Sequence, residues 1–154
     1  MAVAEGEKAP SFKLATDDGG GVSLASLKGR PVVLYFYPKD DTSGCTREAL
    51  DFTAAAKKFE KLGTAVIGVS KDSIESHAKF RKKHKLKIAL GSDTELKAAQ
   101  AYGVWGEKTL YGRKYMGMER ATFLIDAKGV VRKVWRKVKV PGHVETVLEA
   151  AAAL

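Results

Sequence analysis

The sequence predicts an α/β domain of three layers, in which a central mixed β-sheet lies between helices. Short apolar, β-branched runs alternate with segments whose apolar residues recur every three or four positions, as strands and helices do. After residue 120 this alternation gives way to two apolar runs joined by a tight turn, which adds an antiparallel pair. A chain of 154 residues can bury one sizeable core, so we take residues 1–154 as a single domain.

The first expected elements are a short hairpin and a core strand. Residues 12–14 and 22–24 flank the turn-forming sequence Thr-Asp-Asp-Gly-Gly-Gly, which predicts the hairpin. Residues 31–37, Pro-Val-Val-Leu-Tyr-Phe-Tyr, are apolar throughout, which is typical of a strand buried on both faces. A helix is expected next, because one stripe of the following segment holds Cys45, Ala49, Phe52, Ala56 and Phe59.

The middle of the chain repeats this order. Gly63 is placed to end the preceding helix, and the β-branched run at residues 64–69 predicts the neighbouring central strand. Capping-box patterns predict two further helices. Asp72 and Glu75 begin a helix that reaches about His84, and Ser92 and Glu95 begin another that reaches Tyr102.

The last third closes the sheet. Residues 103–117 contain four glycines and predict a loop in which Trp105 and Tyr111 act as lids or packing residues. Residues 121–125 predict a third core strand, and a turn at residues 126–129 leads to an antiparallel fourth strand at 130–140. A final amphipathic helix opens at Pro141 and presents Val144, Val147, Leu148 and Ala151 on one face.

Cys45, the only cysteine, is the candidate reactive residue. It follows a polar loop and lies in the first turn of the helix that is expected after the 31–37 strand. Unpaired backbone N–H groups and the helix dipole favour an anion there, so we expect a nucleophilic thiolate. The alternative is an inert, buried cysteine, because free cysteine often behaves as a small apolar side chain.

Composition limits the other function classes. The net charge is +9, from 27 Lys and Arg against 18 Asp and Glu, and the excess gathers at residues 79–87 and 132–139. A solvated basic surface explains this charge better than a nucleic-acid site, because no nucleic-acid motif accompanies it. The three histidines show no metal-ligand spacing with Cys45. No apolar run is long enough for a leader or a membrane span, so we expect a cytoplasmic protein that does not bind membranes.

The residues around Cys45 carry a resemblance to a known family. The pattern P-x-x-x-T-x-x-C, filled by Pro38, Thr42 and Cys45, resembles the active-site signature of peroxiredoxins. The longer string Tyr-Phe-Tyr-Pro-Lys-Asp-Asp-Thr-x-Gly-Cys-Thr-x-Glu is similar to the bacterioferritin comigratory protein, or peroxiredoxin Q, subfamily, and so are the segments 6–12, 72–80, 111–116 and 119–126. The resemblance implies a thioredoxin-like fold of the peroxiredoxin type. It also implies a peroxidase of hydrogen peroxide and organic hydroperoxides, with no bound cofactor.

The same resemblance implies the roles of five residues. Cys45 attacks the peroxide, Thr42 offers its hydroxyl to the peroxide or the sulfur, and Pro38 shields the sulfur. Arg120 supplies the cation that a thiolate and a developing oxyanion both require. Glu48 is expected to hold the Arg120 guanidinium in a two-pronged pair.

One departure from the subfamily shapes the expected reaction. Many relatives carry a second, resolving cysteine five residues after the first, where this chain has Leu50, and others carry it in the region of residues 80–83, which has none here. We therefore expect a one-cysteine enzyme whose sulfenic acid is reduced by an external thiol such as thioredoxin, glutaredoxin or glutathione, or passes through a disulfide with a partner or a second copy of the chain. We expect a monomer or a weak homodimer. Two other functions stay open at this point, a redox sensor that signals through oxidised Cys45 and a basic nucleic-acid-binding protein.

Overall fold

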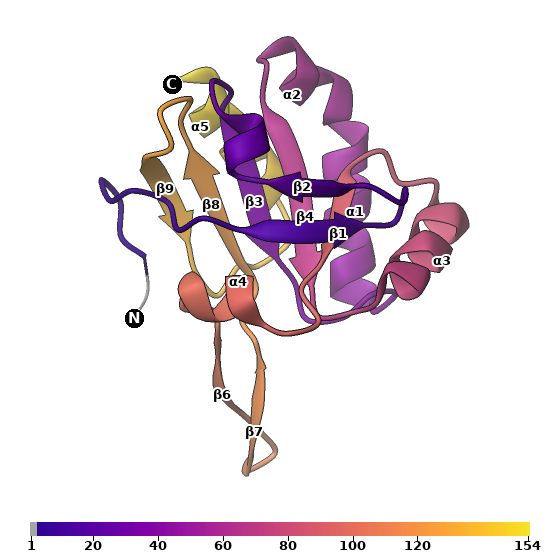
Figure 1. Ribbon diagram of the computed structural model, residues 1–154. Helices are drawn as coiled ribbons and strands as arrows, with labels where there is room; N and C mark the ends of the chain where they lie inside the picture. Colours follow the sequence, from indigo (N-terminus) through magenta and orange to yellow (C-terminus); the bar gives the residue numbers. More distant parts are fainter. Residues whose placement is uncertain (1–2) are drawn as a thin grey trace.

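A seven-stranded mixed β-sheet forms the centre of the computed structural model, which describes residues 3–154 (Figure 1). Residues 1 and 2 of the expected 1–154 domain lie outside the described residues. The strands run in the order β2-β1-β5-β4-β3-β8-β9. Their bounds are β1 Lys13–Thr16, β2 Gly21–Ser23, β3 Val32–Phe36, β4 Ala65–Ser70, β5 Ala89–Ser92, β8 Ala121–Ile125 and β9 Val131–Trp135.

Strand β3 lies inside this sheet and is buried along its whole length. It pairs in parallel with β4 on one side and antiparallel with β8 on the other. Alternate side chains of β3 enter two different cores, with Leu34 and Phe36 in one and Val33 and Tyr35 in the other. This confirms the expectation of a strand that is buried on both faces.

Helices cover both faces, which confirms the three layers (Figure 1). The core that contains Tyr35 also receives side chains from α1 (Ser43–Ala54), α2 (Ala56–Lys61), α3 (Ile74–His84) and α5 (His143–Ala152). The core on the opposite face contains residues of α4 (Lys97–Ala101), with Leu27 of the short 3-10 helix η1 (Ala25–Leu27) packed against it. None of the helices among residues 3–154 is long and apolar enough to cross a membrane.

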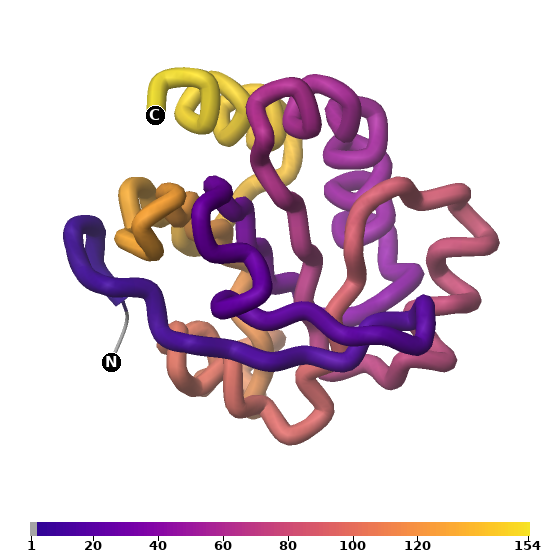
Figure 2. Tube along the Cα trace, turned by 45° about the horizontal axis from the view of Figure 1, so that its top comes forward, coloured from indigo at the N-terminus to yellow at the C-terminus, as the bar shows by residue number. Residues whose placement is uncertain are grey.

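The N-terminal segment runs beside the turn that leads into β9, and Figure 2 shows the two together. Gly6 N donates to Val131 O at 2.8 Å, and Ala9 N donates to Gly129 O at 2.8 Å. The N-terminal segment therefore pairs with the turn between β8 and β9, which lies far from it in the sequence.

Several expected elements are confirmed with small changes in their bounds. The first hairpin is β1–β2, the run at 64–69 becomes β4, and residues 121–125 form β8. Gly63 follows α2 with φ +67°, in the left-handed region where glycine ends helices at little cost. The last helix begins at His143 after Gly142, and its buried residues include Val144, Val147 and Ala151, as its apolar stripe predicts.

The helix expected to reach about His84 is confirmed as α3, but both capping predictions in the middle of the chain are wrong. Ser73 caps α3, since its side chain accepts from Ser76 N, whereas Asp72 accepts from Asp40 N at 2.8 Å. Ser92 is the last residue of β5, a strand that was not expected from the sequence. The short helix α4 follows, and two of its backbone N–H groups, those of Ala98 and Ala99, donate to the Asp93 carboxylate.

Three other segments differ from expectation. Most of the expected loop at 103–117 forms a second, two-stranded sheet, β6 (Trp105–Leu110) with β7 (Arg113–Met118), which projects from the body in Figure 1. The expected strand at 130–140 ends at Trp135. The helix after Cys45 breaks at Ala55 into α1 and α2, and the apolar stripe continues across the break because Phe52 and Phe59 enter the same core.

Candidate active site

Cys45 lies in the first turn of α1, at the end of the loop that follows β3. Thr42 is the N-cap residue, with extended backbone angles, and the first helical bond runs from Thr46 N to Thr42 O at 2.8 Å. The N–H groups of Gly44 and Cys45 precede that bond, so the helix itself leaves them without acceptors. Cys45 is 2% exposed, and its sulfur sits at the positive end of the helix dipole.

Arg120 joins Cys45 to Glu48. It immediately precedes β8, and its Nη2 donates to Cys45 Sγ at 3.3 Å. Its Nη1 donates to Glu48 Oε1 at 2.7 Å, so one guanidinium bridges two side chains of α1. A cation in contact with the sulfur stabilises negative charge on it.

The pair between Arg120 and Glu48 has one prong and not the expected two. The guanidinium divides its donors between Glu48 and the Cys45 sulfur, and Glu48 Oε2 is left buried without a hydrogen-bond partner. Burial raises the pKa of Glu48 to about 7, against the lowering effect of the Arg120 charge.

Gly44 permits this close approach. A Cβ atom at position 44 would lie 3.1 Å from Arg120 Nη2, which is tighter than most real contacts of that kind. A larger residue there would push the guanidinium away from the sulfur. The close contact between Arg120 and the sulfur therefore explains why position 44 is a glycine.

Thr42 and Pro38 lie in the same loop but make no hydrogen bond to the sulfur within the described part of the chain. Thr42 is exposed and its Oγ1 donates to Lys39 O at 2.9 Å, which holds the hydroxyl within the loop. Pro38 is half-buried, directly after the fully buried Tyr37. Of the five residues predicted for the site, the structure joins Cys45, Glu48 and Arg120 by direct bonds.

Comparison with known proteins identifies the family. The sequence profile of the AhpC/TSA family matches residues 5–134. The chain belongs to the AhpC/TSA family. It is 50% identical over 149 residues to Peroxiredoxin Bcp of Bacillus subtilis, a match that covers 97% of this chain and 95% of the relative. It is 44% identical over 147 residues to Peroxiredoxin Bcp of Xanthomonas campestris, covering 94% of this chain and 92% of the relative.

Solved structures of similar proteins have the same fold. The bacterioferritin comigratory protein of Xanthomonas campestris superimposes with a TM-score of 0.88 at 42% identity, covering 92% of this chain and 90% of that one. A PrxQ mutant of Xylella fastidiosa gives a TM-score of 0.90 at 35% identity, covering 98% of both chains. This peroxiredoxin therefore has the expected thioredoxin-like fold and is a thiol peroxidase with one cysteine. The comparisons do not favour a redox sensor or a nucleic-acid-binding protein.

A buried polar network lies next to the loop that precedes Cys45 in this peroxiredoxin. The sequence did not reveal it. Asp40 accepts from Tyr37 Oη at 2.6 Å and from Ser76 Oγ at 2.8 Å. His77 Nδ1 lies 2.7 Å from Asp40 Oδ2, and His77 Nε2 lies 3.1 Å from Gly91 O. Both ring nitrogens of His77 therefore lie within hydrogen-bond distance of an oxygen atom. The network pins α3 to the loop that precedes Cys45.

We expect strong energetic coupling between Asp40 and His77. Removal of either partner leaves the other buried without its main contact, and changes of this kind cost about 3–5 kcal/mol of unfolding free energy. The double variant Asp40→Ala/His77→Leu is expected to lose much less than the sum of the two single losses. Urea unfolding of the four proteins measures the coupling. Losses that add to within about 0.5 kcal/mol would show that the pair does not act as a unit.

His143, the first residue of α5, serves a packing role near the site. His143 Nε2 lies 2.8 Å from Thr122 Oγ1, and the ring packs edge-on against Phe52 and Trp135. Burial and the charge of Arg120 lower the pKa of His143 to about 4, so it is neutral near pH 7. Among residues 3–154 no group of three His, Cys, Asp or Glu side chains could hold a metal ion.

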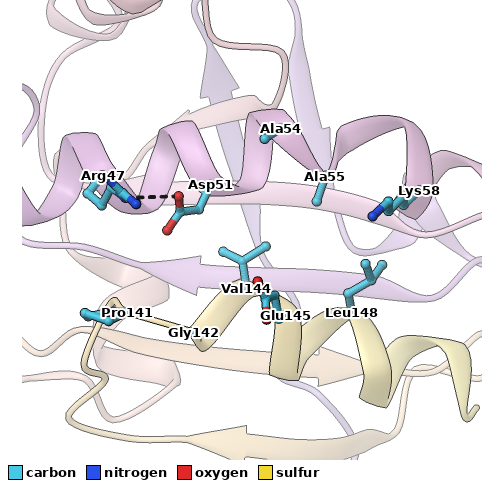
Figure 3. A pocket seen from close by; sticks show the side chains of 10 residues that line it. All are labelled: Arg47, Asp51, Ala54, Ala55, Lys58, Pro141, Gly142, Val144, Glu145 and Leu148. Atoms are coloured by element: carbon cyan, nitrogen blue, oxygen red, sulfur yellow. Dashed lines mark ion pairs between the residues drawn. The ribbon is translucent and has the colours of Figure 1, made fainter.

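A groove of about 370 Å³ lies between α1 and α5 in this peroxiredoxin (Figure 3). Charged side chains border it, including the Arg47–Asp51 ion pair of 3.2 Å and Glu145, and Val144 and Leu148 point into it from α5. Neither Cys45 nor Arg120 is among its lining residues. The groove is therefore separate from the candidate active site.

Proposed function

We propose that Cys45 reduces hydrogen peroxide and organic hydroperoxides and is oxidised to a sulfenic acid. The observation that carries this proposal is the 3.3 Å contact between Arg120 Nη2 and Cys45 Sγ in the first turn of α1. A buried sulfur that meets both a guanidinium and the N-terminus of a helix is suited to be a thiolate nucleophile. The Xanthomonas campestris relative is described for alkyl peroxide reduction, which supports the same chemistry here.

The thiolate attacks one oxygen of the O–O bond, the S–O bond forms and the O–O bond breaks. The second oxygen leaves as an alkoxide or hydroxide and takes up a proton. Arg120 stabilises the negative charge that moves from sulfur to the leaving oxygen. We propose that Thr42 Oγ1 turns from Lys39 O to the bound peroxide and that Pro38 shields the sulfur from water.

We propose that an external thiol completes the cycle. The sequence has no second cysteine, and Leu50, in the place of one resolving cysteine, is 39% exposed on α1. Two electrons must therefore come from outside the chain, and thioredoxin, glutaredoxin and glutathione are the candidate donors. The cytoplasm keeps such thiols reduced, so we propose that location, with residues 1–154 working as one domain in a monomer or weak homodimer.

Steady-state peroxide consumption with each donor tests the external-thiol proposal. We expect turnover far beyond one equivalent with at least one of thioredoxin, glutaredoxin and glutathione, because Cys45 has no internal partner. A matched reaction without donor should stop after one equivalent. If every donor also gives a single equivalent, oxidised Cys45 is not recycled and the redox-sensor alternative gains support.

A further inference from the structure

Three ionisable groups at the centre of the site are largely shielded from solvent. The side chain of Glu48 is 0% exposed, that of Arg120 is 17% exposed, and Cys45 as a residue is 2% exposed. Arg120 bonds to both of the others. If Cys45 and Glu48 were both anionic, one cation would face two buried anions, and burial of an unbalanced charge is costly.

The contacts of Glu48 indicate which of the two acidic groups, Cys45 or Glu48, is uncharged. Its Oε1 has the Arg120 bond, and its Oε2 has no partner and no access to water. An ionised carboxylate with one oxygen left unsatisfied is a costly buried charge, whereas a protonated carboxyl is uncharged. The second buried polar side-chain atom without a partner among residues 3–154 is Tyr35 Oη, on the same face of the sheet. This region of the core is poorly suited to a second negative charge.

The neighbouring elements supply no further cation. Within the described residues, Arg120 is the only basic side chain that bonds to Cys45 or Glu48. From α5, His143 is neutral near pH 7. From α1, the charge of Asp51 raises the pKa of Glu48 further, and Tyr35 of β3 is an uncharged phenol.

We propose that Cys45 and Glu48 share a single negative charge, with Glu48 protonated while Cys45 is a thiolate and ionised once the sulfur becomes an uncharged sulfenic acid. This inference rests on the proposed function of Cys45. It makes Glu48 a proton-holding residue that acts through Arg120, in addition to the positioning role expected from the sequence. The charge of the buried cluster is then the same before and after oxidation.

The cycle balances with this assignment. In the first half, the thiolate and the Glu48 carboxylic acid react with ROOH to give the sulfenic acid, the Glu48 carboxylate and ROH. The proton that Glu48 loses equals the one that the alkoxide gains. In the second half, two external thiols are oxidised to a disulfide, water leaves, and the thiolate and the carboxylic acid return.

Infrared difference spectroscopy tests this proposal directly. Full-length protein is reduced, freed of reductant and oxidised with one equivalent of hydrogen peroxide near pH 7. We expect a carboxylic acid C=O band in the reduced protein that disappears on oxidation. Labelling of glutamate carboxyls with ¹³C should shift this band, which assigns it to glutamate without any substitution. The band should be absent from Glu48→Gln and from Cys45→Ser, and it should persist in the control Asp51→Asn.

The outcomes separate this inference from the proposed function. Intact mass measured on the same samples shows whether Cys45 has gained one oxygen. If Cys45 is oxidised and no glutamate band changes, the shared-charge inference is wrong and the peroxidase proposal stands. If Cys45 is not oxidised at all, the proposed function itself fails. A merely structural Glu48 would leave no band that follows the redox state of the sulfur.

Discussion

Replacement of Cys45 by serine is expected to abolish peroxide reduction and leave the fold intact. A hydroxyl is nearly the size of a thiol, so the buried position keeps its packing, but it does not ionise near neutral pH and is a poor nucleophile toward peroxide. Peroxide consumption with excess thiol donor should fall to the rate of the donor alone. Circular dichroism and urea unfolding check that the variant is folded.

Retained turnover in Cys45→Ser would overturn the assignment, because no other cysteine exists in the sequence to replace it. A suitable control is Ser43→Ala in the same helical turn, which removes an exposed hydroxyl and leaves the sulfur unchanged. This control should keep nearly full activity. The comparison isolates the sulfur from general damage to the N-terminus of α1.

Replacement of Arg120 by alanine is expected to slow Cys45 oxidation by about 10²–10³-fold, the range seen when a preorganised donor to a developing oxyanion is removed. The variant loses the 3.3 Å contact with Cys45 Sγ and the 2.7 Å contact with Glu48 Oε1. We expect it to fold, because a protonated Glu48 leaves no bare charge buried in the core. Stopped-flow kinetics of the pre-reduced protein with peroxide measures the change.

Arg132→Ala provides the matched control for Arg120→Ala. Arg132 is half exposed on β9 and forms a longer, 3.4 Å pair with Asp126, and within the described residues it makes no hydrogen bond to Cys45 or Glu48. Its loss should change the oxidation rate very little, because exposed ion pairs contribute little. An Arg120→Ala rate within a few-fold of this control would show that the guanidinium does not assist the peroxide step.

The sequence allowed much of the fold and of the site to be predicted, because the relevant signals are local. Continuous apolar character identified β3, and an apolar stripe identified the helix that begins next to Cys45. The position of the cysteine between these two elements needed no tertiary information. Arg120 and Glu48 lie 72 residues apart, so their meeting could be expected only from the resemblance to relatives.

The rest depended on contacts that no local pattern reveals. Asp72 accepts a tertiary bond from Asp40 N and does not cap α3, and the first N–H groups of α4 donate to Asp93 and not to the expected Ser92. Strands β6 and β7 are largely exposed on both faces and lack apolar alternation, which made them resemble a loop. The Asp40–His77 pair joins residues 37 positions apart. One available signal was the spacing of His77 and Phe80, which places both on the buried face of α3.

The most direct test of the account is the rate at which pre-reduced protein consumes one equivalent of hydrogen peroxide with no reductant present, followed by intact mass and trapping of the product at Cys45. The account predicts a rate far above that of a free cysteine thiolate, with one oxygen added at Cys45, because Arg120 and the N-terminus of α1 stabilise the reacting charges. A rate no faster than that of free cysteine would contradict it, because the residues around Cys45 would then not accelerate its oxidation.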